Sequence, residues 1–229
     1  MRILHVTDFH FHKPWFAWAK RAAAQYDAVA ITGDLIDAAS LTPAAEQVRW
    51  LTKWARNFPG RLLICRGNHD EQFAGLSPHL QNWLHKMSSP FVTTDGTRVK
   101  IGKWNFECVG WGDVPQFGGP DCVALVHCPP SEARTAKAGP FWVDLGDFEL
   151  GENLRTGINA PWLVLSGHIH WSRNFADRVG ESWSLNPGRG PVGFPPNHIV
   201  IDLEKSVARW VKHDEREFAI SLERPLFAR

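Results

Sequence analysis

The sequence predicts an α/β fold, because short apolar runs alternate with amphipathic helical segments along its first half. Five runs are rich in aliphatic residues, lack polar alternation and end at a turn, as strands covered on both faces do. These runs span residues 3–6, 28–31, 62–65, 123–126 and 163–165. Each is therefore predicted to be a buried strand.

Two helices are predicted between the first three runs, over Pro14–Tyr26 and Thr42–Phe58. The first begins with a proline, which suits the first turn of a helix, and continues with many alanines. The second places Val48, Leu51 and Ala55 at helical spacing. Two hairpins are predicted later, around Gly102-Lys103 and Glu204-Lys205, because strand-like runs flank each pair. Their strands span residues 98–101 with 105–109, and 198–203 with 206–211.

A polar motif follows every one of the five predicted strands. In chain order these are Asp8-Phe9-His10, Gly33-Asp34-Leu35-Ile36-Asp37, Gly67-Asn68-His69-Asp70, the single His127, and Gly167-His168-Ile169-His170. Ligands of open α/β sheets bind beyond the carboxyl ends of the strands. We therefore expect the five motifs to converge on one crevice.

The residue types in these motifs indicate a two-metal hydrolytic site. A carboxylate that bridges two divalent cations holds them roughly 3.5–4 Å apart, and such a pair activates water and clamps both oxygens of a phosphoryl displacement. Asp34 is the natural bridge. Imidazole, carboxylate and amide oxygen together favour Mn, Fe, Zn or Co over Mg or Ca. The expected cofactors are thus two divalent ions from that group.

The ordered motif set resembles that of the calcineurin-like metallophosphoesterases, and the match runs from position 8 to position 170 of 229. The resemblance implies a four-layer α-β-β-α sandwich of two mixed β-sheets, with a dinuclear metal site at the carboxyl ends of the strands. It implies that one ion is held by Asp8, His10, Asp34 and His170, and the other by Asp34, Asn68, His127 and His168.

The resemblance also assigns roles beside the metal ligands. His69 corresponds to the group that protonates the leaving oxygen or stabilises the phosphoryl group, and Asp70 would orient it. Asp37 would accept a hydrogen bond from a ligand histidine, as metal-bound imidazoles usually require. The alternative for Asp37 is a helix cap.

Two later segments resemble family motifs with one substitution each. Val126-His127-Cys128-Pro129-Pro130 resembles the His-His-Pro-Pro run of bacterial cyclic-nucleotide-type phosphodiesterases, with Cys in place of the second His. Only His127 is then a ligand there. Asn186-Pro187-Gly188-Arg189 resembles the Asn-Pro-Gly-Ser turn of small bacterial members, with Arg where Ser is usual. Arg189 is accordingly a candidate phosphate contact.

Four further residues are candidate substrate contacts. Arg66 precedes Gly67 where the protein phosphatases also have Arg, and its fork would bind a dianionic phosphate through two hydrogen bonds. Trp111 and Trp171 follow strands or ligands and would wall a ring of the substrate. His12 would contact a substrate oxygen, the alternative being a solvated loop histidine.

Composition narrows the class of protein. The length predicts one domain over residues 1–229, since no linker-like segment interrupts the motifs. The net charge is +1 and Lys and Arg form no long cluster, so a nucleic-acid partner has no support from charge. No leader precedes the first strand and no apolar stretch approaches the ~20 residues of a membrane span, so a cytoplasmic protein is expected. The four cysteines lack C-x-x-C spacing and are expected to be reduced.

Together these features predict a metal-dependent phosphodiesterase that hydrolyses a small or nucleotide-like phosphodiester. A phosphomonoesterase is the first alternative, although Gly33 to Ala39 lacks the Asp-Arg-Gly ending of protein phosphatases. A nuclease that works on a strand end is the second. A non-catalytic scaffold, such as the retromer subunit that keeps the fold after losing ligands, is disfavoured because His69 and every inferred ligand are present.

Overall fold

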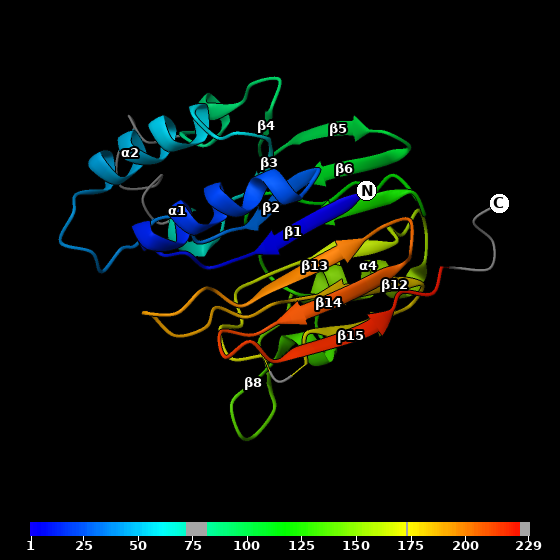
Figure 1. Cartoon of the computed structure of the whole chain (residues 1–229). Coiled ribbons are helices and arrows are strands. Elements are labelled where there is room, and N and C mark those ends of the chain that lie inside the picture. Colours follow the sequence, from blue (N-terminus) through cyan, green and yellow to red (C-terminus); the bar gives the residue numbers. More distant parts are fainter. Residues whose placement is uncertain (72–81, 173, 225–229) are drawn as a thin grey trace.

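Two large mixed sheets form the centre of the computed structural model, which describes residues 1–71, 82–172 and 174–224 (Figure 1). The seven-stranded sheet has the order β15-β14-β13-β1-β2-β3-β4. Its strands are β1 (Arg2–Val6), β2 (Ala28–Thr32), β3 (Arg61–Cys65), β4 (Val92–Thr93), β13 (His198–Asp202), β14 (Val207–Val211) and β15 (Glu217–Ser221). β1 to β4 run parallel, whereas β13, β14 and β15 add antiparallel pairs on the other side of β1.

The six-stranded sheet has the order β11-β12-β10-β7-β6-β5. It consists of β5 (Thr97–Ile101), β6 (Trp104–Cys108), β7 (Cys122–Leu125), β10 (Leu163–Leu165), β11 (Ala176–Val179) and β12 (Ser182–Leu185). The four central strands are parallel, and the edge strands β5 and β11 are antiparallel to their neighbours. A short separate pair joins β8 (Lys137–Ala138) to β9 (Val143–Asp144).

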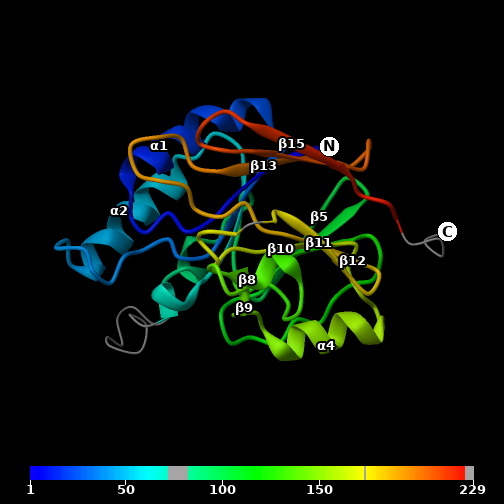
Figure 2. The ribbon, with the colours of Figure 1, turned by 90° about the horizontal axis from the view of Figure 1, so that it is seen from below.

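Helices cover the outer faces of both sheets (Figure 2). The α-helices that lie wholly within the described residues are α1 (Lys13–Ala22), α2 (Ala44–Arg56) and α4 (Phe148–Thr156). The 3-10 turns that do so are η1 (Ala23–Gln25), η3 (His85–Met87) and η4 (Arg134–Ala136). α4 begins after Asp147, whose side chain accepts a hydrogen bond from the Leu150 N–H, and ends at Gly157 in the left-handed conformation.

Three apolar clusters fill the spaces between four layers. The first joins one face of the seven-stranded sheet, including Val29 and Ile64, to α1 and α2. The second lies between the sheets and includes Leu63 and Leu125. The third joins the outer face of the six-stranded sheet to Leu154 of α4. Alternate residues of buried strands point to opposite faces, so each central strand serves two clusters. The α-β-β-α sandwich predicted from the resemblance is confirmed.

The predicted elements are present with small shifts at their ends. Both early helices and all five buried strands form, and both predicted hairpins pair as β5 with β6 and β13 with β14. The sequence pattern did not predict α4, β4, β8, β9, β11, β12 or β15. Late in the chain, β12 pairs parallel to β10.

The carboxyl ends of five central strands meet at one edge of the sandwich. Hydrogen bonds join them directly: Asp8 N–H donates to the Gly33 carbonyl oxygen at 3.2 Å, and Gly167 N–H donates to the His127 carbonyl oxygen at 2.8 Å. His127 Nδ1 lies 2.8 Å from the Thr32 carbonyl oxygen and links the two sheets. The loops that carry the five motifs are thereby held side by side.

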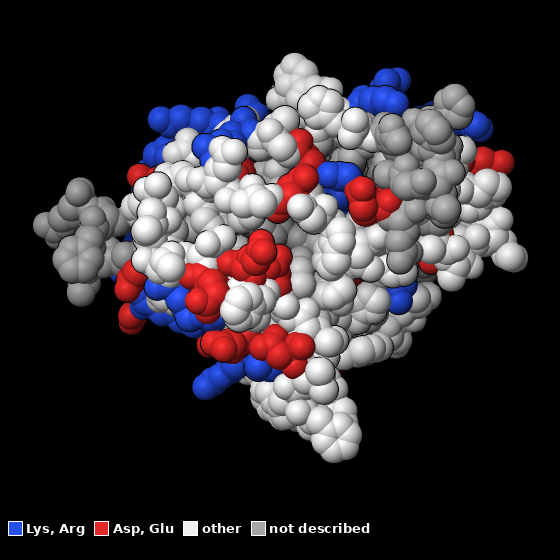
Figure 3. Space-filling model, turned by 180° about the vertical axis from the view of Figure 1, so that it is seen from behind, with Lys and Arg blue, Asp and Glu red and all other residues white. Residues whose placement is uncertain are grey.

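Two surface properties bear on partners. On the face drawn in Figure 3, Asp and Glu side chains gather near the middle, with Lys and Arg among and around them. None of the helices in the described ranges combines the length and the apolar character that crossing a membrane requires.

Candidate metal centre

The backbone of the motif loops turns sharply at four of the predicted ligands. Asp8, His10, Asp34 and His168 have φ angles of 54°, 42°, 51° and 66°. Residues with a side chain rarely adopt positive φ, and such backbone gathers at functional sites, where packing and hydrogen bonds maintain it. Here the left-handed turns direct four polar side chains toward the place where the sheets meet.

Asp8, His10, Asp34 and His170 form one compact group of donor atoms. One ligand atom from each lies within 4.8 Å of all the others. The Nε2 atoms of His10 and His170 are 3.1 Å apart, and His170 Nε2 lies 3.1 Å from Asp8 Oδ1. Asp34 Oδ2 is 3.6 Å from His10 Nε2. The structure thus brings together the four residues predicted to hold the first ion.

Asn68, His127 and His168 form a second group beside the first. Asn68 Oδ1 lies 3.1 Å from His127 Nε2 and 3.1 Å from His168 Nδ1. His127 Nε2 is also 3.4 Å from Asp34 Oδ2. The same Asp34 oxygen therefore faces an imidazole of each group. This is the position that the sequence assigns to a bridging carboxylate.

Hydrogen bonds from neighbouring residues hold these donors in place. The Thr7 hydroxyl lies 2.6 Å from Asp8 Oδ2 and 2.7 Å from the Thr32 carbonyl oxygen. His127 Nδ1, which donates to the Thr32 carbonyl oxygen, leaves its Nε2 free to face Asn68 and Asp34. Asn186 Nδ2 donates to the Gly167 carbonyl oxygen at 2.8 Å. Thr7 and Thr32 were not predicted from the sequence, although Thr7 directly follows β1 and Thr32 ends β2, each next to a motif.

The charge balance of the two groups favours a cation. Burial by itself lowers the pKa of His127, but the Asp34 carboxylate outweighs it and raises that pKa to about 9. Burial likewise raises the pKa of Asp8, yet contacts with His170 and His127 hold it below its ordinary value. The same carboxylates that retain protons on imidazole also attract a divalent ion.

The donor set fits a pair of divalent cations. It combines imidazole nitrogens, carboxylates and one amide oxygen, a mixture that suits first-row transition metals. Asp8 Oδ1 is buried and has no well-aligned hydrogen-bond donor among the described residues. A buried carboxylate oxygen of this kind requires a positively charged partner. A metal ion would satisfy it.

Asp70 makes hydrogen bonds to the backbone of two motif loops. Its buried carboxylate accepts hydrogen bonds from the N–H groups of Leu35, Ile36 and Gly67, at distances from 2.8 to 3.2 Å. Burial and the nearby Asp34 raise its pKa to about 7, against the opposing effect of these N–H donors. Asp70 therefore joins the second motif loop to the third. No hydrogen bond to His69 occurs among those described for Asp70.

His69 lies at the edge of the first donor group. Its ring packs edge-on against His10, with 4.7 Å between the ring centroids. Its Nδ1 is buried and has no hydrogen-bond partner within the described part of the chain. The backbone N–H of His69 donates a hydrogen bond to Asp34 Oδ1 at 3.0 Å, so the backbone of His69 is fixed relative to the shared carboxylate.

Asp37 does not cap a helix, because α2 begins after Pro43. Its Oδ1 accepts a hydrogen bond from the Ala39 N–H at 2.9 Å, which closes a local turn. One of its carboxylate oxygens also lies within 4.8 Å of a ring nitrogen of His10 and of His69. Asp37 is therefore near a predicted ligand histidine, and its proposed contact with that histidine stays a prediction.

The predicted substrate contacts occupy different places. Trp111 lies beside the second donor group, with its ring centroid 5.7 Å from that of His127 and 5.4 Å from that of His168. Arg189 Nε donates to the Asp8 carbonyl oxygen at 3.1 Å. His12 packs edge-on against Trp15 at 4.9 Å. Trp171 is 68% exposed, so it is available only to a partner that covers the surface.

Arg66 is fully engaged by carboxylates of this chain. Its Nε donates to Asp95, its Nη1 to Glu71, and its Nη2 lies 3.3 Å from Asp113. The backbone N–H of Arg66 also donates a hydrogen bond to Asp95 Oδ1 at 2.8 Å. A guanidinium that pairs with three carboxylates has no pair of N–H groups free to bind a phosphate. The structure therefore gives no support to the phosphate contact predicted for Arg66.

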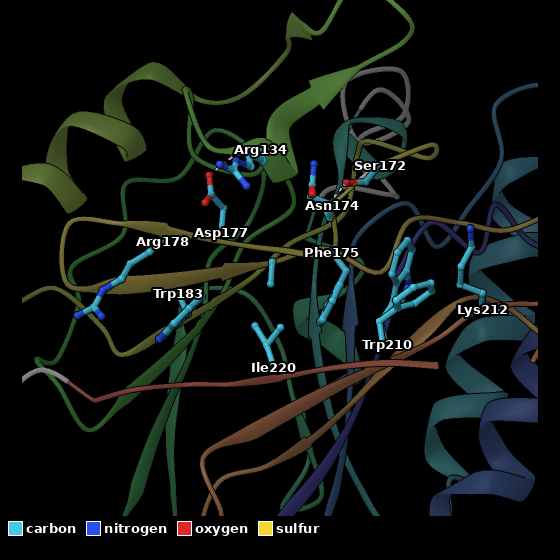
Figure 4. A pocket seen from close by; sticks show the side chains of 12 residues that line it. Arg134, Ser172, Asn174, Phe175, Asp177, Arg178, Trp183, Trp210, Lys212 and Ile220 are labelled. Carbon is cyan, nitrogen blue, oxygen red and sulfur yellow. Dashed lines mark hydrogen bonds between the residues drawn. The ribbon is translucent and has the colours of Figure 1, made fainter. Parts of the chain in front are cut away.

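A separate cavity of about 770 Å³ opens between the β11–β12 and β14–β15 edges of the two sheets (Figure 4). Phe175 and Trp210 stack at its base, and Arg134 and Lys212 lie toward its two ends. It shares no lining residue with the predicted metal ligands. The cavity is thus distinct from the metal centre.

Gly167 provides a test of the metal centre. A Cβ atom there would lie 1.7 Å from Thr7 Oγ and 2.7 Å from Asp8 Oδ2. Gly167→Ala should displace Asp8 and lower both the melting temperature and the affinity for Mn²⁺, since overpacking typically costs about 1–3 kcal/mol. Gly118→Ala is the control, because its Cβ would meet only Cys122 atoms at 3.7 and 3.9 Å. Calorimetric titration and thermal melting measure both effects. Unchanged Mn²⁺ binding by Gly167→Ala would place the ions elsewhere.

Comparisons with known proteins agree with this geometry. The sequence model of the calcineurin-like phosphoesterases matches residues 1–172, and no curated protein sequence matches. The solved structure of TT1561 of Thermus thermophilus is similar, with a TM-score of 0.56 and 14% identity over 97% of this chain and 99% of that one. Yfce, a phosphoesterase from E. coli, has a TM-score of 0.51 and 19% identity over 97% and 100%. These two likenesses show a common fold. Because the family model covers most of its length, this chain belongs to the calcineurin-like phosphoesterase family.

Proposed function

We propose that this protein is a metal-dependent phosphodiesterase that hydrolyses a small or nucleotide-like phosphodiester. Membership of the family makes it a metal-dependent phosphoester hydrolase. The observation that carries the finer proposal is the pair of donor groups that share Asp34, together with a guanidinium at Arg66 that is already neutralised.

The proposed mechanism assigns a task to each group. Asp8, His10, Asp34 and His170 would hold one ion, and Asp34, Asn68, His127 and His168 the other. When bound, such ions supply Lewis-acid activation of water and neutralise charge on the phosphoryl oxygens. His69 would protonate the leaving oxygen, since its ring lies against His10 and its buried Nδ1 lacks a partner among the described residues. Trp111 would exclude water from the side of His127 and His168.

The state of Arg66 favours a diester over a monoester. A terminal phosphate carries two negative charges, and enzymes that select it usually provide a free bidentate cation. Arg66 was the candidate for that task, but its three guanidinium nitrogens face Asp95, Glu71 and Asp113. Arg66 therefore gives no support to the phosphomonoesterase alternative.

The charge distribution favours a small substrate over a nucleic-acid strand. Non-specific binding of a strand depends on several Lys or Arg contacts to phosphates. The net charge of the chain is only +1, and acidic side chains gather near the middle of the face in Figure 3. The non-catalytic scaffold is disfavoured, because all seven predicted ligands lie together with His69.

The first test is turnover of a diester by protein loaded with metal. Purified protein should bind two equivalents of Mn²⁺, measured by elemental analysis, and should hydrolyse bis-p-nitrophenyl phosphate. Activity should disappear with a chelator and return with Mn²⁺, because no other group in the site would activate water. Bound metal should also raise the melting temperature through ligand linkage. A folded sample with fewer than two bound metals and no turnover would refute the proposal.

Neighbouring variants should separate metal binding from leaving-group assistance. Asn68→Ala should lose the second metal and the activity together, because Asn68 faces both His127 and His168. His69→Ala should keep both metals and lose roughly 10²–10⁴-fold in kcat on esters with poor leaving groups. With p-nitrophenolate, which leaves without a proton, the loss should be much smaller. Equal losses of kcat on both kinds of ester would show that His69 does not act as the acid.

Replacing Arg66 tests the preference for diesters. Arg66→Ala leaves the buried Asp95 without its partner, so the free energy of unfolding should fall by about 3–5 kcal/mol in urea titrations. Adding Asp95→Asn should restore part of that loss. Among molecules that remain folded, the ratio of kcat/KM for monoester and diester should stay within about twofold of the wild-type ratio. A selective loss of monoester turnover would instead support the phosphatase alternative.

A further inference from the structure

Arg189 extends from the metal centre with its terminal nitrogens unpaired among the described residues. Its Nε donates a hydrogen bond to the Asp8 carbonyl oxygen at 3.1 Å, and its backbone N–H donates to the His170 carbonyl oxygen at 3.0 Å. Both acceptors belong to predicted metal ligands. No carboxylate in the described part of the chain pairs with this guanidinium, in contrast to Arg66.

The other side of Arg189 faces an aromatic side chain. Its Cζ lies 5.3 Å from the ring centroid of Trp15, within the range of a cation–π contact. Trp15 also packs edge-on against His12, which is two residues beyond His10. Arg189 is therefore a direct physical link between the metal centre and the indole of Trp15.

An apolar cavity of about 330 Å³ begins at Trp15. It lies between α1 and the loop that follows Arg189, and it is lined by His12, Pro14, Trp15, Trp18, Arg21 and residues 192–195. A cavity of this size is within the range that holds small organic ligands. Its volume accommodates one or two fused rings.

The outer wall of this cavity consists of exposed apolar side chains. Val192 is 56% exposed and Phe194 is 54% exposed. The loop is fixed to α1, because Trp15 Nε1 donates to the Phe194 carbonyl oxygen at 2.8 Å. Apolar side chains that line a fixed, open cavity next to a charged centre are typical of a ligand site.

We propose that this cavity binds an organic substituent of the substrate while Arg189 contacts the phosphoryl oxygens, so that the preferred substrates are phosphodiesters with an apolar, ring-containing substituent. This inference rests on the proposed function, because it assumes that the phosphorus lies at the metal centre.

The experiment compares two phosphonates that cannot be hydrolysed by ester cleavage. Phenylphosphonate and methylphosphonate present the same anion and differ in the ring. Calorimetric titration into Mn-loaded wild-type protein should show phenylphosphonate binding about tenfold more tightly, since burial of a ring contributes at least that factor. Phe194→Ala and, independently, Val192→Ala should reduce that preference severalfold without changing the affinity for methylphosphonate.

Two further variants complete the design. Arg189→Ala should weaken both phosphonates by a similar factor, because it removes a contact to the shared anion. Phe141→Ala is the matched control, since Phe141 is 88% exposed on the β8–β9 connection and should change neither affinity.

The outcomes separate this inference from the proposed function. Equal affinities for the two phosphonates in a protein that hydrolyses diesters would overturn the inference and leave the function standing. A preference for phenylphosphonate that survives in both Phe194→Ala and Val192→Ala would also overturn it. Binding of neither phosphonate by a protein that hydrolyses diesters would likewise overturn the inference. Failure of Mn-loaded protein to hydrolyse any diester would instead refute the proposed function. A structure with phenylphosphonate should show the ring between Trp15 and Phe194.

Discussion

Two buried carboxylates, Asp8 and Asp34, lie where the two sheets meet, and the surrounding structure counters their charge. Both side chains are almost completely buried. A buried anion is costly unless hydrogen bonds and positive charge compensate it. Backbone N–H groups of His69 and His168 supply hydrogen bonds, and histidine side chains from both donor groups supply polar contacts. The need to compensate these two groups explains why five loops from both sheets converge here.

Close backbone packing is what allows this convergence. Gly67 lies so near Asp34 that a Cβ atom would come within 2.2 Å of its Oδ1, and Gly33 is equally close to the ring of His127. The Asp70 carboxylate joins the same loops by accepting hydrogen bonds from three backbone N–H groups. The glycines of the motifs are therefore required by the space available, and the buried Asp70 supplies rigidity. Some polar residues of these motifs, such as Asp34, face the metal centre, whereas others, such as Asp70, hold the loops in place.

Much of the centre could be predicted because local patterns determine it. A polar residue after a buried apolar run lies at the carboxyl end of a strand, and parallel strands place such ends together. Prediction failed where partners come from distant parts of the chain. Arg66 pairs with Asp95 and Asp113, and no local pattern around position 66 reveals them. Asp70 likewise accepts hydrogen bonds from residues about 35 positions earlier. Most residues of β11 and β15 are partly or fully exposed, and the four residues of β12 include two serines, so their hydrophobic patterns were too weak to identify them.

The left-handed backbone at Asp8, His10, Asp34 and His168 also restricts how the centre can evolve. Gly, Asn, Asp and, less often, His accept such a backbone at lower cost than β-branched residues, so β-branched donors are disfavoured at these four positions. Asn68, His127 and His170 do not share this restriction, because their φ angles are negative. The backbone therefore restricts the choice of donor residue, and with it the choice of metal, more at these four positions than at the other three.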